Sequence, residues 1–211
     1  MSTSPKISLG IWAFGPMVTR FVPGGYKPDL VAESMPEKVH RAVTGIGDLV
    51  DDYEFHYPGE INRDNLDELR QALDGHGIYA VCAGLHVDPR FGKGGLSSTD
   101  DATRAEALRL TLEGVDLAGE IGANFILWPG IEGYNYPFQT PYRECWARLI
   151  DGMGQAADRA KSHGIKLFLE HKNSEPAMKI FMGNIGMCLH VIHKLRAAAS
   201  TTSRSTWTGS T

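Results

Sequence analysis

The chain has 211 residues, of which 42% are hydrophobic and 22% charged, and its formal net charge is -4 at pH 7. These values are typical of one soluble globular domain. The mild negative charge gives no electrostatic footprint for nucleic acid or for an anionic membrane surface, and it therefore argues against both partners.

The cellular compartment is indicated by what the chain lacks. No apolar run approaches the about 20 residues of a membrane span, and Met1–Pro5 has no signal-peptide architecture. The cysteines Cys82, Cys145 and Cys188 are odd in number and lie far apart in apolar contexts. We therefore expect buried thiols in a reducing compartment and a cytoplasmic protein.

Segments typical of strands alternate along the chain with segments typical of helices. The predicted strands are Lys6–Phe14, Leu49–Phe55, Tyr79–Leu85, Asn124–Trp128 and a fifth that carries Ile165, Leu167, Phe168 and Leu169. The predicted helices are Met35–Thr44, Asn62–Gly77, Thr99–Ile121, Tyr142–His163 and Ile180–Ala199. The last helix has a predicted apolar face of Ile185, Leu189, Ile192 and Leu195.

This alternation predicts parallel βαβ units, arranged either as a doubly wound sheet or as a barrel. No Gly-x-Gly-x-x-Gly sequence opens a helix after a strand, which weakens the dinucleotide-binding alternative. The strands end instead in aromatic and polar residues, as in a (β/α)8 barrel whose site lies at the strand ends. A complete barrel takes about 250 residues. We therefore predict an α/β fold, a partial (β/α)8 TIM barrel with about five βα units.

The segment Lys166–Pro176, KLFLEHKNSEP, carries the clearest chemical signal, because an apolar strand ends there on charged residues. Glu170 and Lys172 are two residues apart, so their side chains point to the same side of a strand. Such a pair can hold a divalent cation and polarise a neighbouring oxygen. It can equally be a salt bridge that faces solvent.

Aromatic residues and a histidine lie at the ends of the other strands. Trp12 follows the first strand in LGIW, His56 the second in FH, Phe91 the third in RFGKGG, and Trp128 the fourth in WPGIEG. A single strand tryptophan is more commonly a core residue. A single histidine at a strand end is more commonly bonded to a backbone carbonyl.

Taken together and in order, these motifs resemble the xylose isomerase family. EHKNSEP is similar to the family's Glu-Pro-Lys-Pro-Asn-Glu-Pro and LGIW to its Phe-Gly-Leu-Trp. FH is similar to the start of Phe-His-Asp-Asp-Asp, RFGKGG to Val-Phe-Lys-Asp-Gly-Gly, and WPGIEG to Trp-Gly-Gly-Arg-Glu-Gly. The resemblance extends over about Ile7–Leu195 and implies an enzyme that interconverts an aldose and a ketose.

The resemblance also implies a role for each charged residue. His56 would assist opening of the sugar ring by proton transfer. Lys172 would stabilise negative charge on the C1 oxygen of the linear sugar. Glu170 would bind the structural one of two divalent ions, Mg2+, Mn2+ or Co2+, and the second ion would promote hydride transfer.

The aromatic residues would form the walls of the pocket. Trp12, Phe91 and Trp128 would stack on the carbon face of a small-molecule sugar and exclude water from it. By the same resemblance, the full-length form is expected to be a homo-oligomer.

Some positions depart from the family's pattern. Gly59 stands where the family has an aspartate that orients the histidine, with Glu60 adjacent, and Ile131 and His171 replace an arginine and a proline. We therefore predict an aldose–ketose isomerase without assigning xylose as its substrate. The alternatives are a sugar epimerase of the same superfamily, which works through paired carboxylates, and a non-catalytic barrel fragment.

The composition becomes Ser/Thr-rich near the end, and we divide the chain into a barrel portion, residues 1–199, and an aberrant tail, residues 200–211. In a neighbouring reading frame, Trp207 and Thr208 must encode aspartate, and suitable codons give Val-Asn-x-Asp-x-x-His, similar to a metal-binding motif of the family. We interpret the tail as a frameshift, with a natural tail as the alternative. Without the later strands we expect an inactive, poorly soluble chain that lacks further metal ligands.

Overall fold

The protein is described by a computed structural model that covers residues 5–19, 21–134, 138–172 and 179–201. The strands of its main sheet are β1 (Ser8–Gly10), β2 (Asp52–Tyr57), β3 (Gly77–Ala83), β4 (Asn124–Leu127) and β6 (Leu167–Leu169). The helices that follow them in turn are α1 (Met35–Ile46), α2 (Leu66–Ala72), α3 (Asp101–Ile121), α4 (Tyr142–Ser162) and α5 (Ile185–Thr201).

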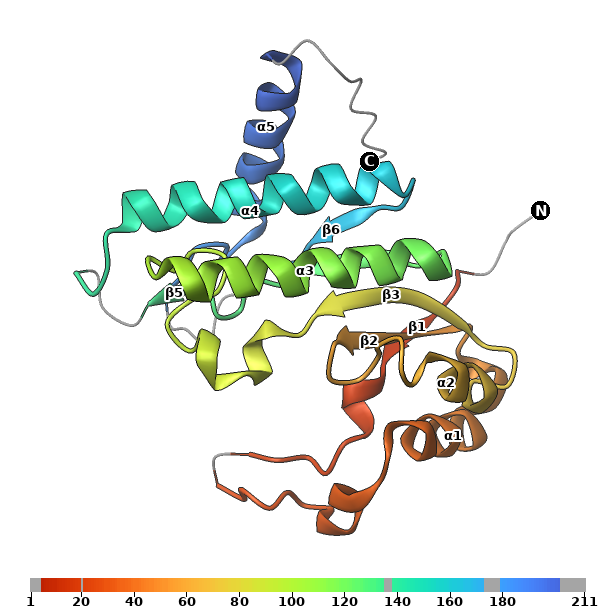
Figure 1. The fold of residues 1–211 in the computed structure, drawn as a ribbon. Helices are drawn as coiled ribbons and strands as arrows, with labels where there is room; N and C mark the ends of the chain where they lie inside the picture. The colour runs from red at the N-terminus through yellow and green to blue at the C-terminus, as the bar shows by residue number, and fades with distance from the viewer. Residues whose placement is uncertain (1–4, 20, 135–137, 173–178, 202–211) are drawn as a thin grey trace.

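The main sheet is parallel throughout, and its strand order is β1-β2-β3-β4-β6 (Figure 1). Each strand therefore lies beside the strand of the preceding βα unit, without the reversal of order that defines a doubly wound sheet. This sequential order confirms the prediction of a partial (β/α)8 barrel with five parallel strands.

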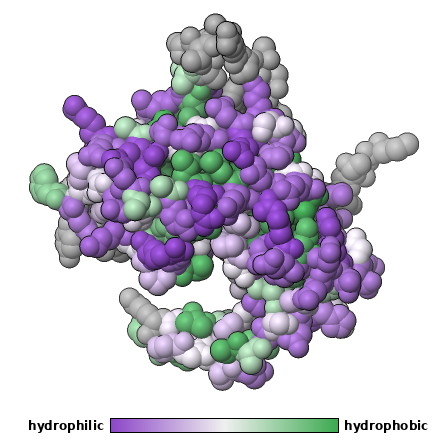
Figure 2. Space-filling model, viewed as in Figure 1, coloured by the Kyte–Doolittle hydropathy of each residue, from purple (hydrophilic) through white to green (hydrophobic). Residues whose placement is uncertain are grey.

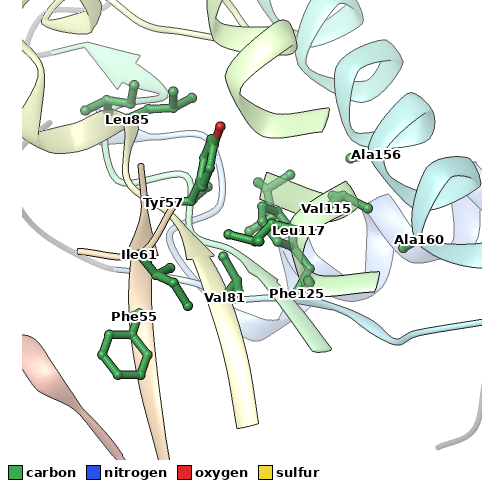
Figure 3. Packing of buried hydrophobic residues seen from close by; sticks show 14 of the residues in the cluster. Phe55, Tyr57, Ile61, Val81, Leu85, Val115, Leu117, Phe125, Ala156 and Ala160 are labelled. Atoms are coloured by element: carbon green, nitrogen blue, oxygen red, sulfur yellow. The ribbon is translucent and has the colours of Figure 1, made fainter. Parts of the chain in front are cut away.

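Helices cover one face of the sheet, and β2 shows this by its alternation. Tyr53, Phe55 and Tyr57 are buried, whereas Glu54 and His56 between them are only half-buried. Most buried side chains of β2, β3 and β4 form one hydrophobic cluster with residues of α1 to α4. Figure 3 shows the part of it in which these strands meet α3 and α4. We call this side, represented by Tyr53, Phe55, Tyr57, Phe125 and Leu127, the covered face.

The opposite side of the sheet carries the alternate residues. His56 is in register with Cys82, Cys82 with Ile126, and Ile126 with Phe168, so these side chains point to the same side. We call the side represented by Glu54, His56, Ile126 and Phe168 the open face, because none of these four residues belongs to the hydrophobic cluster.

Local sequence explains where two helices begin. Ser34 caps α1 in a capping box, because its backbone N–H donates to Glu37 Oε2 at 2.7 Å and its Oγ accepts from the Glu37 backbone at 3.4 Å. Asp100 caps α3 by accepting from the Thr103 backbone N–H at 2.7 Å. Gly122, with φ of 75°, ends α3 in the left-handed conformation that favours glycine.

The predicted first strand is too long. Only Ser8–Gly10 forms β1, and the 3-10 helix η1 (Ile11–Phe14) follows it directly. The chain leaves the sheet at this point and continues as a segment, residues 15–19 and 21–33, that stands away from the body (Figure 1). In Figure 2 apolar patches mark this segment. Its exposed large apolar residues are Met17, Val18, Phe21, Tyr26 and Val31.

The predicted apolar face of α5 is only partly correct, because Leu195 packs against the hydrophobic cluster whereas two other members of that face are exposed. Ile185 and Leu189 are 61% and 50% exposed, whereas Cys188 and Val191 are buried. Apolar residues occur on more than one side of this helix, so its periodicity does not determine which side packs against the body. A short antiparallel pair, β5 (Gly133–Tyr134) with β7 (Lys179–Ile180), was not predicted, because two-residue strands carry no periodic signal.

Two expectations about the environment of the chain can be compared with the structure. Cys82, Cys145 and Cys188 are free and buried, as expected. Within the described ranges, no helix combines the length and the apolar character that crossing a membrane requires.

α5 continues through Ser200 and Thr201. The other residues of the predicted tail, 202–211, lie outside the described part of the chain, so the proposed division of the chain stays a prediction.

Candidate active site

A row of aromatic rings and one ammonium group lies at the carboxyl ends of the parallel strands. The ring centroids of Trp12 and His56 are 4.2 Å apart, those of His56 and His86 4.8 Å, and those of His86 and Trp128 4.5 Å. Lys172 Nζ lies 5.5 Å from the centroid of the Trp128 ring. Each of these five residues lies near the end of a different strand or just after it, in the spatial order of the sheet. We call them the site row.

Glu60 holds His56, which lies near the end of β2. Its Oε2 accepts from the His56 backbone N–H at 2.8 Å and lies 3.0 Å from His56 Nδ1. The His56 and Glu60 side chains are only 13% and 16% exposed. Asn65 Nδ2 donates to the Glu60 carbonyl at 3.1 Å and anchors this turn. A carboxylate at Nδ1 keeps a proton on that nitrogen and leaves Nε2 for other partners. Glu60 thus supplies the orienting carboxylate that Gly59 cannot.

Each tryptophan of the site row lies over a glycine. A Cβ atom at Gly10 would lie 2.2 Å from the Trp12 ring, and one at Gly130 would lie 2.2 Å from the Trp128 ring. Only a residue without a side chain allows the backbone to approach the ring so closely. The Trp12 side chain remains 43% exposed, so it presents a surface that a ligand can reach.

The two charged residues that follow β6 have different surroundings. Lys172 is exposed, and its backbone N–H donates to the Met182 carbonyl at 3.1 Å. Glu170 donates its backbone N–H to Leu127 at 3.2 Å, which continues the pairing of β6 with β4. Burial raises the pKa of Glu54, and the negative charge of Glu170 adds to that rise. The Glu170 carboxylate therefore acts on the open face, where Glu54 lies.

Burial is also the main cause that raises the pKa of the Cys82 thiol, and Glu54, Glu170 and Glu60 add to it. This end of the open face is consequently acidic. Nevertheless, no three His, Cys, Asp or Glu side chains among the described residues form a cluster that could hold a metal ion. Mg2+ requires about six oxygen ligands, part of them water. The described residues alone therefore do not fit the divalent-ion site predicted at Glu170.

The structure separates Phe91 from the other predicted site residues. Phe91 ends the 3-10 helix η5 (Pro89–Phe91), and its side chain is 0% exposed within the hydrophobic cluster. A ring without exposed surface cannot stack on a ligand unless this loop moves, so its role as a pocket wall stays a prediction. His86 instead takes the place after β3 in the site row. The sequence contains one indication of this role, because His86 is the first ionisable residue after β3, as Glu170 is after β6.

Glu132 ties the loops around the site row together. It is 2% exposed, and its carboxylate accepts from the backbone N–H groups of Gly95, Leu96 and Ser97 at 3.2, 2.7 and 3.0 Å. Ser97 Oγ donates to the same carboxylate at 2.6 Å. Burial raises the pKa of Glu132, and these donors oppose the rise. The Glu132 carbonyl accepts from the Phe181 N–H at 2.9 Å, so one residue joins the loops after β3 and β4 to β7.

Known proteins resemble this chain in sequence and in fold. The family model described as xylose isomerase-like TIM barrel matches residues 44–196. The xylose isomerase of Thermus thermophilus is 35% identical over 132 residues, which cover 60% of this chain and 34% of that protein. The xylose isomerase of Thermus caldophilus is 34% identical over the same length. The chain thus spans about a third of the length of these curated relatives.

Solved structures of sugar epimerases share the fold. An L-ribulose 3-epimerase has a TM-score of 0.61 at 18% identity, with 92% of this chain and 58% of that chain covered. The 3-keto-D-glucoside 4-epimerase of E. coli has a TM-score of 0.60 at 16% identity, with 78% and 60% covered. A D-allulose 3-epimerase from Methylomonas sp. has a TM-score of 0.59 at 18% identity, with 93% and 62% covered. At these identities the likeness concerns the fold alone.

Proposed function

Because the chain belongs to the xylose isomerase-like TIM barrel family, we propose that it forms part of an aldose–ketose sugar isomerase. The observation that carries this proposal is the site row, in which four motif residues from four different strands come together around His86. Those four residues are Trp12, His56, Trp128 and Lys172. Their gathering supports a common pocket at the place where barrel enzymes carry their chemistry.

We assign proton transfer to His56. Opening of a sugar ring moves a proton from the anomeric hydroxyl to the ring oxygen. A histidine with Nδ1 held by Glu60 at 3.0 Å can exchange that proton through Nε2. Lys172 would donate hydrogen bonds to a carbonyl oxygen on which negative charge develops. The Trp12 and Trp128 rings would pack against the carbon face of the sugar and exclude water.

A divalent ion, Mg2+, Mn2+ or Co2+, is part of this proposal, with Glu170 as one of its ligands. Such an ion supplies positive charge that stabilises negative sugar oxygens. The described residues do not complete its coordination. Titration calorimetry with MnCl2, for the chain and for its Glu170→Gln variant, tests the assignment. Heat of binding that is lost in the variant supports Glu170 as a ligand, and identical curves contradict it.

A sugar epimerase is the second candidate, because several of the solved structures that share the fold are epimerases. Product analysis of the chain with aldoses and ketoses and each of the three metal salts separates the candidates. Movement of the carbonyl group between C1 and C2 supports an isomerase. Inversion of configuration with the carbonyl in place supports an epimerase. A folded chain that neither converts sugars nor binds metal is the non-catalytic fragment, the outcome expected if this chain is truncated.

Self-association is the remaining part of the proposal. The segment of residues 15–19 and 21–33 exposes apolar side chains, among them Phe21 at 78% and Tyr26 at 64% exposure. Exposed apolar surface of this kind favours contact with another protein surface. Sedimentation velocity at several concentrations tests whether the chain forms a homo-oligomer, and a monomer at all of them contradicts it.

A further inference from the structure

We propose that His86 and Trp128 form a binding subsite for a sugar hydroxyl, with His86 as a residue that contacts the ligand directly. This inference rests on the proposed sugar substrate. None of the family motifs in the sequence includes His86, and the motif that follows β3 contains Phe91 instead.

The backbone around β2 and β3 places His86 in the site. The Gly84 N–H donates to the Tyr57 carbonyl at 3.0 Å. A Cβ at Gly84 would lie 2.5 Å from that carbonyl oxygen and 3.3 Å from His56 Cβ. The backbone at Gly84 therefore approaches the backbone at Tyr57 as closely as a glycine permits. The 3-10 helix η4 (Leu85–Val87) begins one residue later, so the His86 ring lies directly beside His56.

The rings that flank His86 suit a sugar. His56 meets His86 at an interplanar angle of 69°, and Trp128 meets it at 82°, so both contacts are edge-on. Carbohydrate pockets combine apolar ring surfaces, which pack on C–H groups, with a few polar groups that bind hydroxyls. Trp12 and Trp128 provide the ring surfaces at positions on either side of the two histidines.

His86 is unlike a structural histidine in its hydrogen bonding. His76, which packs against Tyr53, has Nδ1 2.9 Å from the Leu73 carbonyl and Nε2 3.4 Å from the Gly47 carbonyl. His86 Nδ1 and Trp128 Nε1 are buried and make no hydrogen bond of standard geometry with the described residues, although the Ala83 backbone lies near enough to His86 to oppose the lowering of its pKa. Buried polar atoms without partners are rare, and they call for a functional explanation.

The charge state of His86 also suits a hydroxyl. Burial lowers the pKa of His86 to about 4, and the nearby charge of His56 adds to the effect. The ring is therefore neutral near pH 7. A neutral imidazole has one donor and one acceptor, whereas a protonated one has donors only. A sugar hydroxyl both donates and accepts, so it matches the neutral ring.

The test uses the complete chain and a linear pentitol, which carries the hydroxyls of an open-chain pentose without its carbonyl group. The histidine ring nitrogens are observed by 15N NMR during the titration. We expect the His86 signals to shift along the same saturation curve as those of His56 and the Trp128 indole. The His86→Phe variant keeps a ring of similar shape and should bind the pentitol about tenfold more weakly. His193→Asn, which changes an exposed histidine on α5, should bind like the unchanged chain.

Three results would contradict the subsite. The first is that the His86 signals stay in place while those of His56 move. The second is that the His86→Phe variant binds as tightly as the unchanged chain, and the third is that the folded chain binds no pentitol. The NMR titration of the unchanged chain decides even if the variant does not fold. Product analysis judges the proposed function separately, so the two proposals can fail independently.

Discussion

The covered and open faces of one sheet have different tasks, although their residues alternate along the same strands. On the covered face, Phe55 and Phe125 are 0% exposed within the hydrophobic cluster. On the open face, their neighbours Glu54, His56 and Ile126 remain half-buried. A shift of one residue along a strand thus separates the residues that stabilise the fold from those available for chemistry.

The largest expected effect comes from changing adjacent residues of β4. Phe125→Ala removes a fully buried ring and should lower the free energy of unfolding by about 3–5 kcal/mol. Ile126→Ala, on the open face, should lower it by about 1 kcal/mol, because that side chain already meets solvent. Urea unfolding followed by circular dichroism measures both. Equal losses would show that the open face is packed as tightly as the covered face.

Glu132 is an exception to this division, because it is a buried carboxylate that acts on the site side. Glu132→Gln replaces an acceptor by an amide whose N–H2 group opposes the backbone donors. We expect a loss of about 2–3 kcal/mol in the free energy of unfolding. The control is Glu120→Gln, because Glu120 forms an ion pair with Arg63 in which both side chains are about half exposed, 49% and 48%. This control should cost about 0–1 kcal/mol. Similar losses would mean that the donors to Glu132 find other partners.

The sequence predicts those features of the fold that local residues determine. The alternation of apolar segments gives the order of the βα units, and Ser34 and Pro36 mark the start of α1 because capping needs only neighbouring residues. The resemblance places Trp12, His56 and Lys172 at strand ends, and parallel strands bring these ends to one edge of the sheet.

Features that depend on the path of a loop could not be predicted in this way. Phe91 and His86 lie five residues apart after β3, and only the turn at Gly84 decides which of them faces the site. The family's aspartate is missing at position 59, and Glu60, one residue later, replaces it, because the turn after β2 returns the Glu60 carboxylate to His56. Spacing in the sequence does not reveal either turn. The buried partners of Glu132 are likewise some 35 residues away along the chain.

A smaller effect should follow from displacing one ring of the site row. In Gly130→Ala the new methyl group would overlap the Trp128 ring, so the ring must move, at a cost of about 1–3 kcal/mol. The 15N–1H signal of the Trp128 indole and its nuclear Overhauser effects to His86 report the displacement. Gly24→Ala is the matched control, because a Cβ there meets no atom within 4 Å. An unchanged indole signal in Gly130→Ala would mean that the close approach of ring and backbone is not rigid.

The smallest expected effect is a pH dependence that comes from His86. Its folded-state pKa is lowered to about 4 by burial, with His56 and Lys172 adding to the shift and Glu60 and the Ala83 backbone opposing it. In the unfolded chain the ordinary histidine pKa is about 6.5, so the unfolded state binds this proton more tightly. Stability contributed by neutral His86 is therefore complete above about pH 6.5 and is lost as the pH falls toward about 4. We expect about 1 kcal/mol, less than the full shift implies, because the ring is partly exposed.

Urea midpoints measured at intervals between pH 7.5 and 4.5 give this slope. The His86→Phe variant should lose less stability over that range than the unchanged chain, whereas His193→Asn should follow the unchanged chain. The difference between the two faces predicts one further result. A group on the open side of the sheet should titrate without unfolding the cluster on the covered face, so near-ultraviolet signals from Phe125 and its neighbours should persist at pH 5. Parallel slopes for all three proteins would contradict the neutral state that the hydroxyl subsite requires.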